Sequence, residues 1–146
     1  MPQDFVPSDF AVPTVAVLGS LRLEPLGPGH NAGDYAAWTS SIDHIRATPG
    51  FPAGDWPAMM TPAANLRDLE MHAKDFALRE GFTYTVLDAA GTVVGCVYIY
   101  PSKTKGFDAH VRSWVSQEHS DMDSPLAEGL RDWLRAEWPF ARIDYR

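Results

Sequence analysis

The chain divides into a proline-broken start and a regularly patterned remainder. In residues 1–20, three prolines alternate with large apolar residues, which is too interrupted for a helix and too apolar for a free tail. We therefore expect residues 1–20 to form an extended arm laid over the domain. Leu21, Leu23 and Leu26 then flank polar residues, and this alternation predicts a first strand closed by Pro25.

Three stretches have the apolar spacing of amphipathic helices. The first spans residues 31–46. The second follows Thr61 and Pro62, a capping residue and the proline favoured in a first helical turn, and we expect Gly81 to end it. The third spans residues 124–138 and stops before a proline.

The period changes to two in the second half of the chain, which is the spacing of strands. Residues 82–87 and 92–100 form a hairpin around a turn at 88–91, residues 109–116 add a strand, and residues 140–145 predict a short final one. This order predicts one α+β domain, a mostly antiparallel sheet with helices on its faces.

Composition narrows the class of protein. A length of 146 residues with 45% hydrophobic residues suits one domain with a real core. The formal charge of −7 argues against a nucleic-acid binder or an anchor to anionic membranes. Cys96 is the only cysteine, and no apolar run approaches the roughly 20 residues of a membrane helix. The N-terminus has no basic leader. We expect a cytoplasmic protein.

The ordered elements resemble the front part of the GNAT superfamily of acyl-CoA-dependent N-acetyltransferases. Residues 21–26 look like the opening strand of that family, and residues 88–95 look like its central hairpin, with a glycine entering the third strand. Trp114 and Val115, followed by the helix from Ser124, look like the fourth strand and the cofactor-binding helix behind it. The resemblance therefore implies a GNAT-like domain over residues 21–146.

The same resemblance implies a reaction and places its groups. In the family an amine attacks the thioester of an acyl-CoA, so acetyl-CoA is the implied cofactor, a small amine the implied substrate, and no metal is expected. The backbone donor that stabilises the oxyanion, together with the cofactor contact, falls on Trp114, Val115 and Ser116. Glu118 or His119, at the end of that strand, is the implied general base.

The chain departs from the family where the cofactor diphosphate is held. The family has a glycine-rich turn there, whereas residues 116–125 contain no glycine and three carboxylates. Residues 118–137 hold six acidic side chains and two arginines, a net charge of −4. Two like charges about 6 Å apart repel by roughly 2 to 3 kcal/mol at an effective dielectric of about 20. The helix and two strands that follow the fifth strand in the family do not follow here.

Two neighbouring strands carry a candidate ligand site. Tyr98 and Tyr100 share a face of one strand, and His110, Arg112 and Trp114 share a face of the next. If the register joins these faces, the patch can bind a small anionic or aromatic ligand, with Arg112 pairing a carboxylate or phosphate. Alternatively, the aromatic side chains pack under the two N-terminal helices while Arg112 and His110 reach an edge.

Three functions remain open from the sequence. The leading interpretation is a divergent GNAT-like protein whose transferase activity is weak, lost or dependent on a partner. The second is an active acetyl-CoA-dependent N-acetyltransferase of unknown amine substrate. The third is a non-enzymatic module that binds a small ligand or another protein. A final strand at residues 141–145 with no strand after it would be an unprotected edge, which predicts a homodimer through that edge.

Overall fold

The computed structural model describes residues 4–52 and 54–146. Within these ranges one sheet has six strands in the spatial order β1-β2-β3-β4-β5-β6. Neighbouring strands are antiparallel, except that β6 runs parallel to β5. The strands are β1 (Ala16–Leu18), β2 (Leu21–Pro25), β3 (Phe82–Leu87), β4 (Val93–Pro101), β5 (Ala109–Val115) and β6 (Ile143–Asp144).

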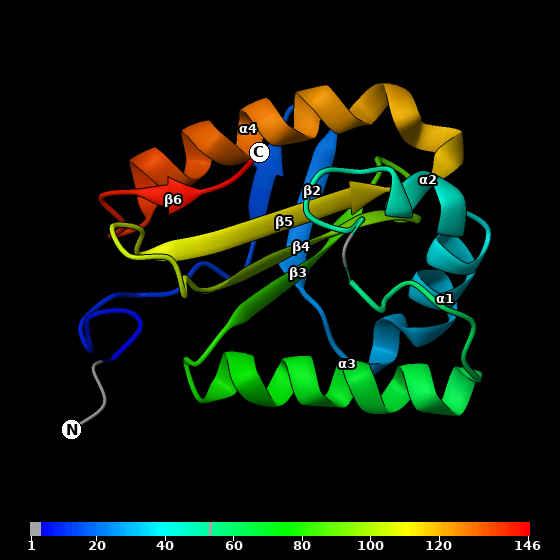
Figure 1. Cartoon of the computed structure of the whole chain (residues 1–146), viewed down its shortest axis with the longest axis horizontal. Helices are drawn as coiled ribbons and strands as arrows, with labels where there is room; N and C mark the ends of the chain where they lie inside the picture. The colour runs from blue at the N-terminus through cyan, green and yellow to red at the C-terminus, as the bar shows by residue number, and fades with distance from the viewer. Residues whose placement is uncertain (1–3, 53) are drawn as a thin grey trace.

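Helices cover both faces of this sheet, as Figure 1 shows, with α4 on one side and α1 and α3 on the other. Each side has its own apolar core, one beneath α4 and the arm and one beneath α1 and α3. The helical segments are η1 (Pro28–His30), α1 (Asn31–Thr39), α2 (Ile42–Arg46), α3 (Pro62–Ala77), η2 (Gln117–Met122) and α4 (Asp123–Glu137). None of the helices described is both long and apolar enough to span a bilayer.

The N-terminal arm lies against the core beneath α4. Phe5, Phe10 and Val12 pack on that core, and the hydroxyl of Tyr84 donates to the carbonyl of Pro13 at 2.6 Å. The arm expected over residues 1–20 includes a strand, since residues 16–18 form β1 and pair with β2. A strand of three residues offers too few positions for a period of two to be recognised in the sequence.

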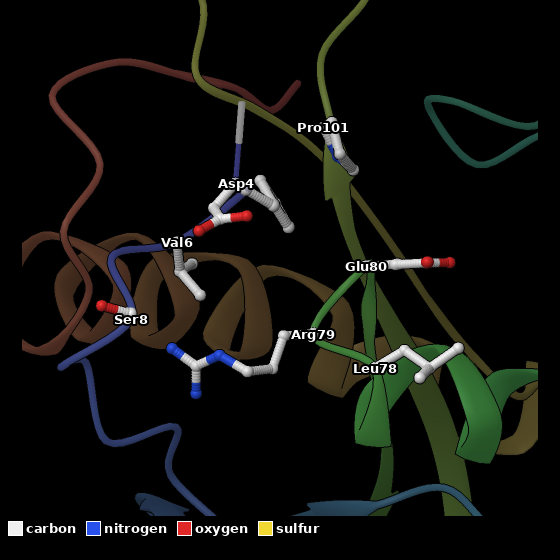
Figure 2. A pocket seen from close by; sticks show the side chains of 8 residues that line it. Asp4, Val6, Ser8, Leu78, Arg79, Glu80 and Pro101 are labelled. Atoms are coloured by element: carbon white, nitrogen blue, oxygen red, sulfur yellow. The ribbon is translucent and has the colours of Figure 1, made fainter. Parts of the chain in front are cut away.

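A cavity of about 500 Å³ lies between the start of the arm and the turn that joins α3 to β3 (Figure 2). Figure 2 shows Arg79 extending toward the arm, where its Nη2 donates to the carbonyl of Pro7 at 2.7 Å. Asp4 and Glu80 on its wall are exposed to solvent. None of the site residues predicted from the sequence, all of which lie in the described ranges, lines this cavity.

Two predicted helices have different ends in the structure. The helix expected over residues 31–46 is two helices, α1 and α2, separated at Ser40 and Ser41. The hydroxyl of Ser40 donates to backbone carbonyls of α1, and such competition favours helix ends. Thr61 caps α3 as predicted, since its Oγ1 accepts from the N–H of Ala64 at 3.1 Å. The helix ends at Ala77, before Gly81.

The final strand is shorter than expected. Residues 140–145 were predicted to be extended, but β6 contains only Ile143 and Asp144, paired with Ala109 and His110 at the start of β5. The hydroxyl of Tyr145 bonds to Ser113 beyond the paired residues. Two paired residues stay below the length at which an alternating pattern identifies a strand.

Candidate functional site

The register of β4 and β5 joins the two halves of the predicted patch. Cys96 pairs with Trp114, Tyr98 with Arg112, and Tyr100 with His110. Because side chains alternate along a strand, these six share one face of the sheet. Cys96 and Trp114 are fully buried there, in the core beneath α1 and α3. The six side chains are therefore neighbours on one face of the sheet, but they differ in what they contact.

Arg112 is held by aromatic rings rather than by an ion pair. Its guanidinium carbon lies 4.9 Å from the ring centroid of Phe51 and 5.2 Å from that of Tyr98. The backbone of Gly50, at a φ of +97°, lies over its aliphatic stem, where a Cβ would approach Cγ to 3.1 Å. Among the described residues no carboxylate lies within 4 Å of Arg112. Cation–π contacts thus hold the side chain while its five donors stay available.

A cavity of about 230 Å³ opens beside this guanidinium, between the sheet and α3. Tyr98 and Arg112 line it from the sheet, Asp68 and His72 from α3, and Asp34 from α1. Trp56 and Met71 contribute apolar wall, as do two leucines. The cavity therefore combines one guanidinium, two carboxylates, one imidazole and a phenol with aromatic and aliphatic surface.

Hydrogen bonds fix the tautomer of His72. The hydroxyl of Tyr100 donates to Oδ2 of Asp75 at 2.8 Å, so the Tyr100 oxygen must accept the bond of 2.9 Å that joins it to Nδ1 of His72. The proton is therefore on Nδ1, which also lies 3.1 Å from the hydroxyl of Thr83. Nε2 carries a lone pair. Burial lowers the pKa of His72, so the imidazole is neutral at pH 7.

The ring of Tyr100 can hold this position because residue 81 is glycine. A Cβ on Gly81 would overlap the edge of the Tyr100 ring. Gly81 does not end a helix, because α3 ends at Ala77; instead, Gly81 lets this ring lie against the backbone at the start of β3. Gly81 thus supports His72 indirectly, through the Tyr100 hydroxyl.

Asp34 is a buried carboxyl that the sequence analysis did not identify as a site residue. It is 4% exposed, and its Oδ2 accepts from Nδ2 of Asn65 at 3.1 Å. Asn65 also donates to Asn31 and accepts from the indole of Trp38. Burial raises the pKa of Asp34 to about 6, although the bond from Asn65 opposes the rise. The available signal was position, because Asp34 lies one turn before Trp38 on the buried face of α1.

The four predicted ligand residues separate into three roles. Tyr98 and Arg112 line the cavity, and Tyr98 also accepts the indole N–H of Trp114 at 3.0 Å. Tyr100 lies behind His72. His110 lies at the other end of the patch, where its Nδ1 is 3.2 Å from a carboxylate oxygen of Asp144 on β6. The register therefore brings the four predicted ligand residues onto one face of the sheet, but only Tyr98 and Arg112 line the cavity.

The residues predicted for catalysis and cofactor contact do not line this cavity, although Trp114 donates to Tyr98, which does. Val115 and Ser116 are buried at the end of β5, where the N–H of Ser116 donates to the carbonyl of Val94 at 2.8 Å. Glu118 and His119, expected at the end of the strand, lie beyond it in η2. Nδ1 of His119 lies 2.8 Å from the hydroxyl of Ser116, and Glu118 is exposed.

The first turn of α4 carries an ion pair instead of an open anion site. Oδ1 of Asp123 accepts from Nη2 of Arg146 at 2.9 Å, and the same nitrogen donates to the carbonyl of Ser113 at 3.0 Å. Glu118 and Asp121 remain exposed on the preceding η2. The residues present therefore do not fit a diphosphate in the way that a glycine-rich turn would. Within the described ranges, no group of three or more His, Cys, Asp or Glu side chains is arranged to hold a metal ion.

Comparison with known proteins gives a match in structure alone. No family model matches the sequence, and no curated protein matches it. Ribosomal-protein-S5-alanine acetyltransferase from Vibrio fischeri has a TM-score of 0.62 at 12% identity, over 85% of this chain and 69% of that one. The acetyltransferase MccE, solved with acetyl-CoA and AMP, has a TM-score of 0.67 at 11% identity, over 85% of this chain and 66% of that one.

RimJ from Mycobacterium smegmatis, solved with CoA-disulfide, has a TM-score of 0.65 at 16% identity and is matched over 88% of this chain. The chain spans only 63–69% of the length of these three proteins. Similarity at this level of identity concerns the backbone and not the chemistry of a site. The fold class expected from the sequence is confirmed, and the chain has the acyltransferase fold of the GNAT superfamily.

Proposed function

We propose that the chain is a divergent GNAT-fold protein in which acyl-CoA-dependent N-acyl transfer is weak, lost or dependent on a partner. One observation carries this proposal: Glu118 and Asp121 are exposed on η2 directly before α4, where the cofactor diphosphate would bind, and Asp123 in the first turn of α4 is already paired with Arg146. The attraction of a helix N-terminus for an anion, about 0.3 to 1 kcal/mol, does not offset the repulsion from two carboxylates, roughly 2 to 3 kcal/mol each at about 6 Å.

A second candidate is an active N-acetyltransferase acting on a small amine, and the cavity favours it specifically. An amine must be deprotonated before it attacks an acyl group, and His72 offers a neutral imidazole with a free Nε2 lone pair. Trp114, Val115 and Ser116 would supply the oxyanion donor and contact acetyl-CoA in this alternative. Glu118 and His119 remain the alternative bases at the other end of β5.

A third candidate is a binding module that acts as a homodimer in the cytoplasm. Its support is the two-residue β6, whose pairing partner among the described strands is β5 on one side. A second copy adding its own edge strand would cover the exposed backbone groups. Light scattering across a range of concentrations tests this candidate, and a strict monomer at the highest concentration would remove it.

Isothermal titration with CoA and acetyl-CoA separates the first two candidates. The titration is run at low salt and again at about 150 mM salt, where the Debye length is near 8 Å. Weak acyl transfer predicts no binding in the micromolar range at 150 mM. Micromolar binding at both salt concentrations would contradict the leading proposal and favour the active enzyme.

A charge-neutralised variant identifies the cause of poor binding. Glu118→Gln combined with Asp121→Asn removes the exposed carboxylates of η2 and leaves the Asp123–Arg146 pair intact. The matched control is Glu70→Gln, which removes an exposed charge of α3, on the other face of the sheet from α4. If the acidic segment repels the cofactor, the double variant binds CoA more tightly than the control does.

A further inference from the structure

The cavity beside Arg112 carries opposite charges that do not neutralise each other. Arg112 and Asp68 both line it, and neither has an ion-pair partner within 4 Å among the described residues. We propose that this cavity binds a small aminocarboxylate, a free amino acid with an apolar side chain. This inference deepens the proposed function, because it names the ligand of the same cavity, and it does not require CoA to bind.

Arg112 is suited to the carboxylate of such a ligand. The guanidinium lies against the rings of both Phe51 and Tyr98, so binding a ligand costs little additional ordering of this side chain. A guanidinium and a carboxylate form two parallel hydrogen bonds in one plane. A ligand carboxylate would therefore supply the partner that the described residues do not give to Arg112.

The opposite wall of the cavity is suited to an ammonium group. Asp68 comes from α3 and Asp34 from α1, and the charge of Asp68 adds to the rise in the pKa of Asp34. A cation placed between the two carboxylates would reduce their repulsion. His72, whose Nε2 carries a lone pair, also lines the cavity. The acceptors here thus outnumber the donors that the protein itself supplies.

The size and the walls of the cavity limit the rest of the ligand. A volume of about 230 Å³ lies below the roughly 300 Å³ at which pockets for drug-sized ligands begin, and it therefore suits a ligand of the size of a single amino acid. Trp56, Leu69 and Met71 line it with apolar surface. A nucleotide or a folded peptide is too large, and a purely polar amino acid would leave this surface without contact.

Matched ligands test the two charges separately. L-leucine, L-methionine and L-phenylalanine are titrated calorimetrically into the full chain. The tightest of them is then compared with its analogue without the amine and with its analogue without the carboxylate. For phenylalanine these are 3-phenylpropanoate and 2-phenylethylamine. We expect at least one amino acid to bind, and each single-charge analogue to bind at least about tenfold more weakly, in line with the loss of one charged hydrogen-bonded pair.

Two variants assign each charge to its side chain. Arg112→Gln should abolish the preference for the amino acid over the amine analogue, and Asp68→Asn should reduce the preference over the carboxylate analogue, because Asp34 still lines the cavity. Arg135→Gln and Asp132→Asn are the controls, since both lie on exposed α4 positions away from the cavity. Circular dichroism checks that each variant is folded.

The inference is overturned if none of the three amino acids binds, if a single-charge analogue binds as tightly, or if folded Arg112 and Asp68 variants keep the preferences of the parent protein. Its failure is distinguishable from failure of the proposed function, because the CoA titration is independent. Micromolar CoA binding with amino-acid binding intact contradicts only the proposal of weak acyl transfer. Absence of both kinds of binding contradicts only the ligand inference.

Discussion

Replacing Asp34 with asparagine tests whether the buried carboxylate of Asp34 lowers the free energy of unfolding. The Asp34 side chain is 4% exposed, and burial raises its pKa from 3.8 to about 6. The folded protein therefore binds this proton more tightly than the unfolded chain does. The ionised carboxylate destabilises the fold by about 3 kcal/mol above the folded pKa, and this cost disappears below the unfolded pKa.

Asp34→Asn keeps an oxygen that can accept from Asn65 and removes the charge. We expect the variant to be more stable than the parent by up to about 3 kcal/mol at about pH 7.5, and the difference to fall toward zero near pH 4. Urea unfolding followed by tryptophan fluorescence measures both proteins at each pH. Other titrating groups cancel in the difference, including Glu24, whose pKa is lowered by its bond to His30.

A constant difference between the two proteins at both pH values would refute this reasoning, and so would a variant that is less stable than the parent at about pH 7.5. Either result would mean that Asp34 is solvated or paired in solution. If Asp34→Asn both stabilises the protein and abolishes amino-acid binding, the Asp34 carboxylate lowers the stability of the fold and serves ligand binding.

Three further substitutions have definite expected outcomes. Gly81→Ala forces a Cβ into the Tyr100 ring and should lower the free energy of unfolding by about 1 to 3 kcal/mol, whereas Gly29→Ala, which meets open space, should change it by less than about 0.5 kcal/mol. Thr61→Ala removes the cap of α3 and should cost about 1 kcal/mol, with most of the loss restored by serine. Tyr98→Phe leaves a buried indole N–H without its acceptor and should cost about 1 to 3 kcal/mol. Urea unfolding measures each free energy of unfolding. Wild-type stability of Gly81→Ala, Thr61→Ala or Tyr98→Phe would contradict the contact that the substitution removes or obstructs.

The elements with strong local patterns were predictable from the sequence. The hairpin of β3 and β4, the cap of α3 and the apolar stripe of α4 depend on residues close together in the chain, so periodicity and capping rules identify them. The strand β1 and the limits of β6 were not predictable, because two or three residues are too few to show an alternating pattern. The same local rules placed Tyr98 on one face of β4 and Arg112 on one face of β5, whereas the register that joins these faces came from the structure.

The class of fold, the acidic segment before and within α4, and the strand face that carries Arg112 all follow from residues close together in the chain. Which side chains form a site depends instead on contacts between distant segments. Phe51 lies over Arg112, Asp34 lies opposite Asn65, and His72 lies against Tyr100, each pair joining segments far apart in the chain. Burial and hydrogen bonding set the charge and the tautomer of such groups, and both depend on neighbours that local sequence does not specify.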